Sequence, residues 1–277
     1  MKNILVPIDF SKDSMNAFLH SILFANTLKA NLRLIHVRKN KDYDEPFVLA
    51  GPDSGYGKTV EEFCQSIVSR YLQIYNGGGK LDFIIKKGKI YKAIIEQAEK
   101  DKTDLIIMGT HGISGFEEFW LGSNAYRVVS KASCPVLTIR NGFKKKIITK
   151  IVLPIDAHRE TRQKIPFTVE LAKEFDAEVH VVDVRSTERK DIKKRLNNYA
   201  DQAMHYVMEH GVKGVRNSKV GSNIADITIA YAVHANADMI AMVSNQRGTP
   251  VNMHLSTTAQ QMVNHSPLPI LSIYPDF

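Results

Sequence analysis

The sequence predicts an α/β protein of two doubly wound domains, each with a five-stranded parallel sheet of the Rossmann-like kind. Short apolar runs alternate with segments of helical periodicity from residue 3 to about residue 140, as in successive βαβ units. The same succession restarts at residue 150, which indicates duplication of one domain. A glycine-rich loop follows the fourth predicted strand, at the edge where open parallel sheets bind ligands.

The first βαβ unit spans residues 3–37. Residues 3–9 are apolar up to Asp9 and predict a buried strand. Ser11 suits the N-cap of the following helix, whose apolar residues recur at helical spacing as far as Asn26. Residues 31–37 alternate as a second strand. A right-handed crossover between the two strands makes them parallel.

The middle of the first half predicts a helix over 60–74, a third strand over 81–85 and a helix over 89–100. The long polar loop before them contains a stretch, Gly51 to Thr59, that looks like a P-loop. A P-loop would need its first glycine at position 52, but the chain has a proline there, which has no N–H to offer a phosphate. We therefore predict no P-loop.

The stretch from 104 to 140 predicts the fourth strand, a loop, a helix and the closing strand. An apolar run over 105–108 leads into three glycines within 109–115, a helix begins at 122–124, and a second apolar run covers 134–139. Glycine lets backbone N–H groups approach a ligand closely. The first N–H groups of a helix have no partner inside it and favour an anion. This stretch therefore predicts a phosphate site.

The second half repeats the first strand by strand. Residues 150–156 repeat 3–9, 179–185 repeat 32–38, 237–242 repeat 103–108, and 266–273 repeat 132–139. We place the domains at residues 1–141 and 147–277, with a linker at about 142–146. Repeats of domain size indicate two copies of one fold rather than a solenoid.

The spacing G-x2-G-x9-G-S, at Gly109, Gly112, Gly122 and Ser123, resembles the ATP-binding signature of the universal stress protein family. The Cys-Pro-Val-Leu run that begins at Cys134 is similar to that family's closing strand. The resemblance covers nearly the whole chain, as a tandem pair. It implies a cytoplasmic stress-response protein that binds ATP, accompanied by Mg²⁺. It also implies that the halves pair through their last strands as an intramolecular pseudo-dimer; a further homodimer stays open.

The same resemblance implies which residues form the nucleotide site of the first half. They follow the first, second and fourth strands and begin the helix after the glycine loop: Pro7, Asp9, Val37, Met108, Gly109, His111, Gly112, Gly122, Ser123 and Asn124. In the family the aspartate lies against the adenosine, and the main chain at the position of Val37 bonds the adenine edge. Efficient ATP hydrolysis is not predicted, because the motif offers no convincing general base.

The two halves are not expected to be equivalent. A gapless alignment places Val243 at Gly109, Gln246 at Gly112 and Ser256 at Gly122, so all three signature glycines are lost. Valine is β-branched and resists backbone angles that glycine adopts. We therefore expect the first half to bind nucleotide and the second mainly to complete the pair, with another kind of ligand in the second half left open.

Several of these residues have structural alternatives. Asp9 could instead cap backbone N–H groups before the helix, and Val37 could be ordinary core. Ser123 and Asn124 could serve only as a helix cap. His111 favours a phosphate contact over catalysis, because nothing nearby in sequence orients it. A scaffold protein of the same fold that binds no nucleotide is the alternative function.

Composition limits the classes of partner. The net charge of +8 favours contact with anions, but the basic residues are scattered. The densest run, residues 144–146, has no interleaved aromatics, so we expect a solvated connector and consider nucleic acid unlikely as a partner. No apolar run reaches the length of a membrane span. Two cysteines, Cys64 and Cys134, indicate neither a disulfide framework nor a metal site.

Overall fold

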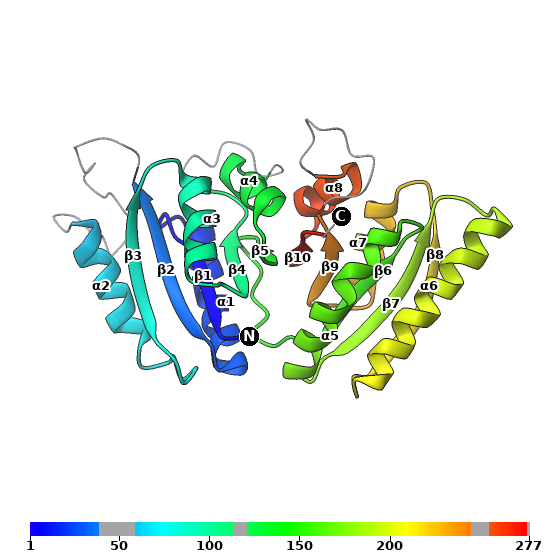
Figure 1. The fold of residues 1–277 in the computed structure, drawn as a ribbon, viewed down its shortest axis with the longest axis horizontal. Coiled ribbons are helices and arrows are strands. Elements are labelled where there is room, and N and C mark those ends of the chain that lie inside the picture. The colour runs from blue at the N-terminus through cyan, green and yellow to red at the C-terminus, as the bar shows by residue number, and fades with distance from the viewer. Residues whose placement is uncertain (39–58, 113–120, 245–254, 276–277) are drawn as a thin grey trace.

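The computed structural model describes residues 1–38, 59–112, 121–244 and 255–275. In the first half, strands and helices alternate (Figure 1): β1 (Asn3–Pro7), α1 (Lys12–Leu28), β2 (Asn31–Arg38), α2 (Val60–Tyr71), β3 (Leu81–Lys87), α3 (Ile90–Lys100), β4 (Leu105–Gly109), α4 (Ser123–Lys131) and β5 (Val136–Ile139).

The second half follows the same plan with one addition, the 3-10 helix η1 after its first strand. Its elements are β6 (Lys150–Ile155), η1 (Arg159–Lys164), α5 (Ile165–Glu174), β7 (Glu178–Arg185), α6 (Lys190–Glu209), β8 (Gly214–Val220), α7 (Ile224–His234), β9 (Met239–Val243), α8 (Thr257–His265) and β10 (Ile270–Ile273).

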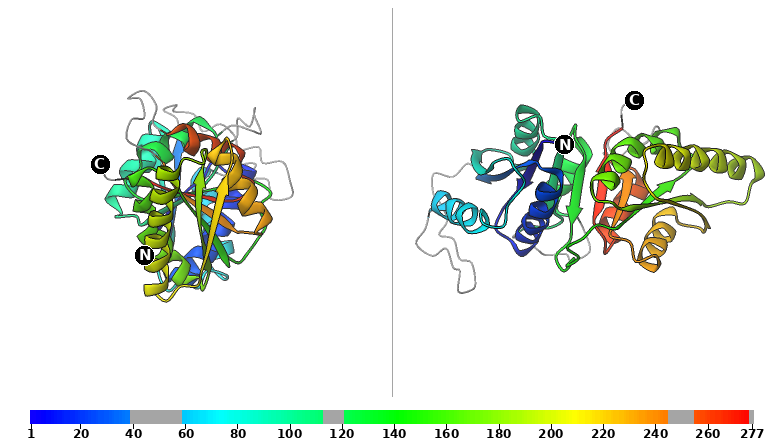
Figure 2. Two further views of the ribbon diagram at one scale, coloured as in Figure 1. Left: turned by 90° about the vertical axis from the view of Figure 1, so that its right-hand side faces the viewer. Right: turned by 90° about the horizontal axis from the view of Figure 1, so that it is seen from below.

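The strands form a single ten-stranded sheet in the order β3-β2-β1-β4-β5-β10-β9-β6-β7-β8. Strands within each half are parallel, and β5 pairs with β10 in antiparallel register, with Leu137 opposite Leu271. Figure 2 shows the two halves meeting at this junction. The predicted doubly wound halves and their pairing through the last strands are therefore confirmed, with the two sheets fused into one.

Helices cover both faces of the sheet (Figure 2). Side chains alternate between the faces along each strand, so Ile4 and Val6 join the core layer under α1, α2, α5 and α6. Leu5 points the other way, into the layer under α3, α4, α7 and α8. Both layers contain buried side chains from both halves, which makes the pair one packed body.

Most predicted elements are present with shifted ends. The first strand ends at Pro7 rather than Asp9, the third continues to Lys87, and the helix predicted over 60–74 ends at Tyr71. Ser11 is the N-cap of α1, as predicted, because its side chain accepts a hydrogen bond from Ser14 N–H. The P-loop-like stretch before Thr59 and the glycine at 115 lie outside the described residues.

The connector between the halves is anchored to the second half at Lys145. Lys145 Nζ lies 2.7 Å from Asp238 Oδ1 and 2.9 Å from Asn236 Oδ1. The other carboxylate oxygen of Asp238 accepts hydrogen bonds from Thr149 and Lys150 N–H. Lys144 and Lys146 are exposed, as expected of a solvated connector, whereas the ammonium of Lys145 is also held by the buried carboxylate of Asp238.

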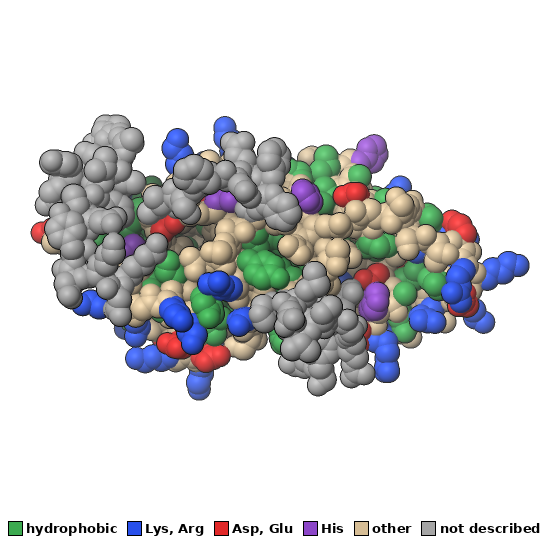
Figure 3. Space-filling view, turned by 90° about the horizontal axis from the view of Figure 1, so that it is seen from above, with side chains coloured by type: hydrophobic (Ala, Val, Ile, Leu, Met, Phe, Trp, Pro, Cys, Tyr) green, Lys and Arg blue, Asp and Glu red, His purple; other side chains and the backbone are tan. Residues whose placement is uncertain are grey.

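Basic side chains are spread over the face shown in Figure 3 rather than gathered in one patch. Among the helices that the structure describes, none combines the length and the apolar character that a membrane span requires.

Candidate functional site

The predicted site residues gather at one edge of the sheet, where β1, β2 and β4 end and α4 begins. Pro7 ends β1, Val37 lies near the end of β2, and buried Met108 precedes Gly109 at the end of β4. This is the edge at which parallel sheets present their loops to a ligand.

Asp9 supports the turn between β1 and α1. Its Oδ1 accepts hydrogen bonds from Ser11 N at 3.1 Å and from Ser11 Oγ at 2.6 Å. The residue between them, Phe10, has φ of 65°, a left-handed backbone that is unusual for a bulky side chain. The structural alternative for Asp9 is therefore real, and backbone strain concentrates beside the candidate site.

Gly112 is the loop residue that meets Asp9. A Cβ added at Gly112 would lie 2.5 Å from Asp9 Oδ2, so any larger residue must push the loop or the carboxylate aside. The two predicted residues are thus direct neighbours, although they are far apart in sequence. The absence of a side chain at Gly112 brings the loop backbone onto the second oxygen of this carboxylate.

Gly109 lets the end of β4 pack against the start of α1. A Cβ there would lie 2.8 Å from the carbonyl carbon of Asp13 and 3.0 Å from its oxygen. Both are backbone atoms, which yield less easily than a side-chain tip. The glycine motif predicts a ligand contact at Gly109; close packing of a helix on a strand also requires this glycine.

His111 is oriented by Asp13, a residue that sequence reasoning missed. Asp13 Oδ2 lies 3.1 Å from His111 Nδ1 and accepts a hydrogen bond from His111 N at 3.2 Å. The hydroxyl of Thr110 is 2.9 Å from the same ring nitrogen. The sequence alone predicts nothing nearby that orients His111; the structure shows that the adjacent Thr110 and the sequence-distant Asp13 of α1 both contact its ring.

The second ring nitrogen of His111 has a different environment. Nε2 is buried and has no hydrogen-bond partner among the described residues. Unpartnered buried polar atoms are uncommon in folded proteins, and each needs an explanation. An acceptor or donor on a bound ligand would satisfy this atom while Asp13 holds the ring in place.

Helix α4 begins without a side-chain cap. Gly122 is its N-cap and makes no side-chain hydrogen bond, while Gly122 N–H donates to Thr110 O at 2.8 Å. Ser123 is exposed and Asn124 half-buried in the first turn. The prediction that a helix begins here is confirmed, but the alternative that Ser123 or Asn124 is its cap is wrong, because the cap position belongs to glycine.

Val37 presents its main chain past the end of β1. Ile35 O accepts from Ile8 N on the β1 side of the strand, and Arg38 O accepts from Gly88 N on the β3 side. Main-chain groups alternate sides along a strand, so those of Val37 face the β1 side. The β1–β2 ladder stops at the pair Pro7–Ile35, and the N–H and C=O of Val37 lie beyond it.

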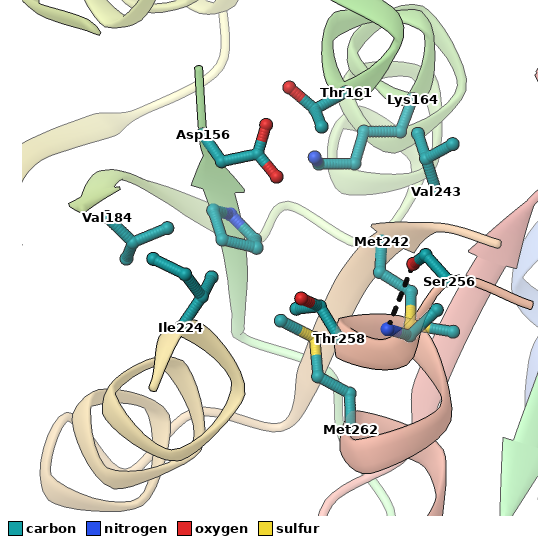
Figure 4. A pocket seen from close by; sticks show the side chains of 12 residues that line it. Asp156, Thr161, Lys164, Val184, Ile224, Met242, Val243, Ser256, Thr258 and Met262 are labelled. Atoms are coloured by element: carbon teal, nitrogen blue, oxygen red, sulfur yellow. Dashed lines mark hydrogen bonds between the residues drawn. The ribbon is translucent and has the colours of Figure 1, made fainter. Parts of the chain in front are cut away.

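The second half contains a cavity at the corresponding edge (Figure 4). Seven of its lining residues are the repeat counterparts of predicted site residues in the first half. They are Pro154 (for Pro7), Asp156 (for Asp9), Val184 (for Val37), Met242 (for Met108), Val243 (for Gly109), Ser256 (for Gly122) and Thr258 (for Asn124). The repeat thus preserves the place of the site while its chemistry changes.

The first N–H groups of α8 in the second half are capped by a side chain, whereas those of α4 in the first half have no side-chain cap. Ser256 is the N-cap of α8, and its Oγ accepts from Ala259 N–H at 3.2 Å, the dashed line in Figure 4. A side chain therefore occupies one of the N–H groups that would otherwise be available to an anion. Glycine at the same place in α4 has no side chain that could cap these groups.

A residue of the second half also reaches the glycine loop of the first. Asn264, a buried residue of α8, accepts a hydrogen bond through Oδ1 from Leu121 N–H at 2.9 Å. Leu121 directly precedes the N-cap Gly122. Figure 1 draws α4 and α8 on either side of the junction between the halves. The backbone that leads into α4 is therefore held by the partner half.

The sequence and the fold were compared with those of known proteins. The model of the universal stress protein family matches residues 1–140 and again 148–273. Two universal stress proteins of Methanocaldococcus jannaschii are 34% and 33% identical, each over 50% of this chain and over 82% and 94% of their own lengths. The crystal structure of a universal stress protein from Archaeoglobus fulgidus has a TM-score of 0.71 at 18% identity, covering 99% of this chain and 96% of its own.

Proposed function

The chain belongs to the universal stress protein family, and we propose that its first half binds an adenine nucleotide, ATP, at the edge formed by β1, β2, β4 and α4. The start of α4 carries this proposal. Gly122 leaves the first N–H groups of the helix uncapped, and such groups with the helix dipole favour a phosphate. The matching helix α8 is capped by Ser256.

Each predicted residue then has a role set by its surroundings. The main-chain groups of Val37, past the β1–β2 ladder, suit the edge of an adenine ring. Asp9 Oδ2 faces Gly112, beside the place of the ribose. His111, held by Asp13, offers its unpartnered Nε2 to a phosphate oxygen, and the N–H groups of Ser123 and Asn124 complete the cradle.

Mg²⁺ would accompany the triphosphate mainly through phosphate oxygens and water, as this ion usually does. The described part of the chain holds no cluster of three or more acidic, histidine or cysteine side chains suited to a metal ion. Asp13 is already engaged by His111 and Thr110. The residues therefore fit a nucleotide-borne Mg²⁺ better than a metal bound by the protein itself.

Hydrolysis is expected to be slow at most. Asp13 orients His111, so this pair could position a water. Phosphoryl transfer also needs a basic side chain to stabilise the developing charge, and residues 109–124 include no lysine or arginine. Saturable fast turnover that disappears on replacing His111 by Gln would contradict this expectation, and single-turnover kinetics with ATP measure it directly.

The proposal is tested by exchanging the helix caps between the halves. Gly122→Ser copies the cap of α8 into α4, and Ser256→Gly makes the reverse change as the matched control. Isothermal titration calorimetry should show one ATP per chain for the natural protein. Gly122→Ser should weaken binding about tenfold or more, since the new Oγ competes for the N–H groups. Ser256→Gly should leave it unchanged.

Two results would reject the proposal. Two equivalent ATP sites per chain would show that loss of the glycines does not matter. No heat and no rise in melting temperature with ATP would favour the alternative function, a scaffold of the same fold, because a ligand of the native state must stabilise it. Circular dichroism of both variants confirms that the fold is retained.

A further inference from the structure

The cavity of the second half contains a buried lysine that has no equivalent in the first half. Counted from Asp156 as the counterpart of Asp9, Lys164 corresponds to Ala17, a fully buried core residue of α1. Lys164 is only 2% exposed. In Figure 4 its side chain points into the cavity, on the side where Asp156 and Thr161 lie.

The ammonium of Lys164 lacks direct partners. In the part of the chain that the structure describes, Nζ makes no hydrogen bond and no ion pair, and its main-chain oxygen accepts from Thr168 Oγ1. An ammonium has three N–H donors, and a buried charge without such partners is costly. Burial lowers the pKa of Lys164 to about 8, and the charge of Asp156 opposes that shift. The group is therefore still mostly charged at neutral pH.

The cavity has a polar end and an apolar wall. Asp156, Thr161 and Lys164 form the polar end. Val184, Ile224 and Met262 belong to the wall, where the hydroxyl-bearing Thr258 lies beside Met262 (Figure 4). The non-atom space of this pocket is about 330 Å³, a volume that includes open solvent, so the enclosed part is much smaller. Side chains that replace glycine, above all Val243, fill part of the place that corresponds to the nucleotide site. The remaining space suits a small molecule.

The charges around Lys164 set the charge of that molecule. Asp156 lies close enough to act on Lys164, and His158 hydrogen-bonds to the same carboxylate through its N–H at 2.8 Å. A doubly charged phosphate would be repelled by Asp156. A single negative charge satisfies the ammonium with less repulsion, and a short hydrocarbon chain matches the apolar wall.

We propose that this cavity binds a short monocarboxylate. Its carboxylate oxygens accept hydrogen bonds from Lys164 Nζ, and its hydrocarbon chain lies against Met242, Met262 and Val184. The second half would then bind a ligand of a different chemical class from that of the first half. The ligand is distinct from the nucleotide proposed for the first half, and neither proposal depends on the other.

The methionines provide the test. The chain has nine; Met242 and Met262 line the cavity. Met108 is the counterpart of Met242 in the first half, and Met208 is 62% exposed. Protein labelled with ¹³C at the methionine methyls is titrated with sodium propionate, with sodium phosphate, and with sodium chloride at matched ionic strength.

The expected result is local and saturable. Propionate should shift the methyl resonances of Met242 and Met262 along one binding curve, while those of Met108 and Met208 stay in place. Lys164→Leu should abolish the shifts. Lys173→Leu, a change of an exposed lysine on α5, should preserve them. Adding ATP to the same sample reports separately on the first half through Met108.

The proposal is overturned by any of four results: no propionate shift beyond that of chloride, saturation by phosphate but not propionate, a shift at Met108 in place of Met242, or shifts that persist in Lys164→Leu. If Lys164→Leu fails to fold, the comparison of Met242 with Met108 in the natural protein still decides.

Discussion

The aspartates after β1 and β6 show how one residue is used differently in two copies of a site. Asp9 accepts from the backbone and hydroxyl of Ser11, whereas Asp156 accepts from His158. Burial alone would raise the pKa of Asp156, but hydrogen bonds from His158 and the charge of Lys164 lower it overall. A neighbouring lysine thus changes the electrostatics of a position that the repeat preserves.

Lys164 gives the first prediction at this scale. Its pKa is about 8 in the folded protein and ordinarily 10.5, so between these values the unfolded chain binds more protons than the folded one. Stability attributable to Lys164 therefore rises as pH increases from 8 to 10.5, by on the order of 3 kcal/mol. Urea unfolding of the natural protein and of Lys164→Leu at several pH values measures the difference.

The control for this prediction is Lys173→Leu, which removes an exposed lysine. The free-energy difference between the natural protein and this control should stay constant over the same pH range. If the natural protein and Lys164→Leu also keep a constant difference, the ammonium of Lys164 is not held in a costly environment, and the prediction is wrong.

At the scale of the element, the end of β4 or β9 determines how the helix after the first strand begins. In the first half, Gly109 allows α1 to start at Lys12, with the backbone of Asp13 against the strand. In the second half Val243 takes that place, and the 3-10 helix η1 packs there instead, so α5 starts only at Ile165. A different residue at the end of the strand thus accompanies a different helix start, and Pro166 in the first turn of α5 suits that start.

This relation predicts the effect of Gly109→Val, which copies the residue of the second half. The new Cβ would lie 2.8 Å from the backbone of Asp13, so α1 must move or unwind. We expect a loss of about 1–3 kcal/mol in unfolding free energy and loss of ATP binding, because Asp13 no longer orients His111. Urea unfolding and calorimetry measure the two effects. A variant of unchanged stability would show that α1 does not need the glycine.

The sequence predicted those parts of the fold that depend on local patterns. Alternating apolar runs and helical periodicity located the strands and helices around Leu5 and Phe18, and the repeat predicted the second half. It could not predict η1, because the strand against which η1 packs, β9, lies far along the chain. It also missed Asp13 beside His111. A carboxylate in the first turn of α1 was the available signal, but the contact exists only when β4 lies against α1.

For the whole molecule, the junction of β5 and β10 joins two half-sheets and covers an edge of each. Thr138 pairs with Ile270 and Val136 with Ser272 in antiparallel register. An uncovered edge strand is a template for pairing with another chain. Within one chain, β10 therefore pairs with the edge strand β5, which a single copy of the domain would leave unpaired.

A fragment that ends before β6 tests this view. With β10 removed, the edge of β5 and the apolar side chains around Leu137 become exposed, so the fragment should self-associate in a concentration-dependent manner. Size-exclusion chromatography with light scattering measures the mass. The substitution Thr138→Pro in this fragment removes one main-chain N–H donor from the exposed edge of β5 and should reduce the association. A fragment that stays monomeric at every concentration would contradict the prediction.

The hydrogen bond between Asn264 and Leu121 predicts an effect across the junction. In Asn264→Ala the N–H of Leu121 loses its acceptor, and we expect a cost of about 1–2 kcal/mol in stability. ATP affinity should fall about three- to tenfold, because the backbone before Gly122 is less firmly held. Calorimetry measures this, with Gln260→Ala on the same helix as control. Unchanged ATP affinity would show that the loop is independent of α8.

That hydrogen bond also limits how such a chain can be recombined. The loop before α4 takes one of its backbone partners from α8, so the first half does not carry every contact that holds this loop. A chimaera that grafts this half onto the second half of another tandem protein would keep every glycine of the motif. Unless the graft also brought an amide acceptor to the place of Asn264, it would leave the peptide group of Leu121 without its partner.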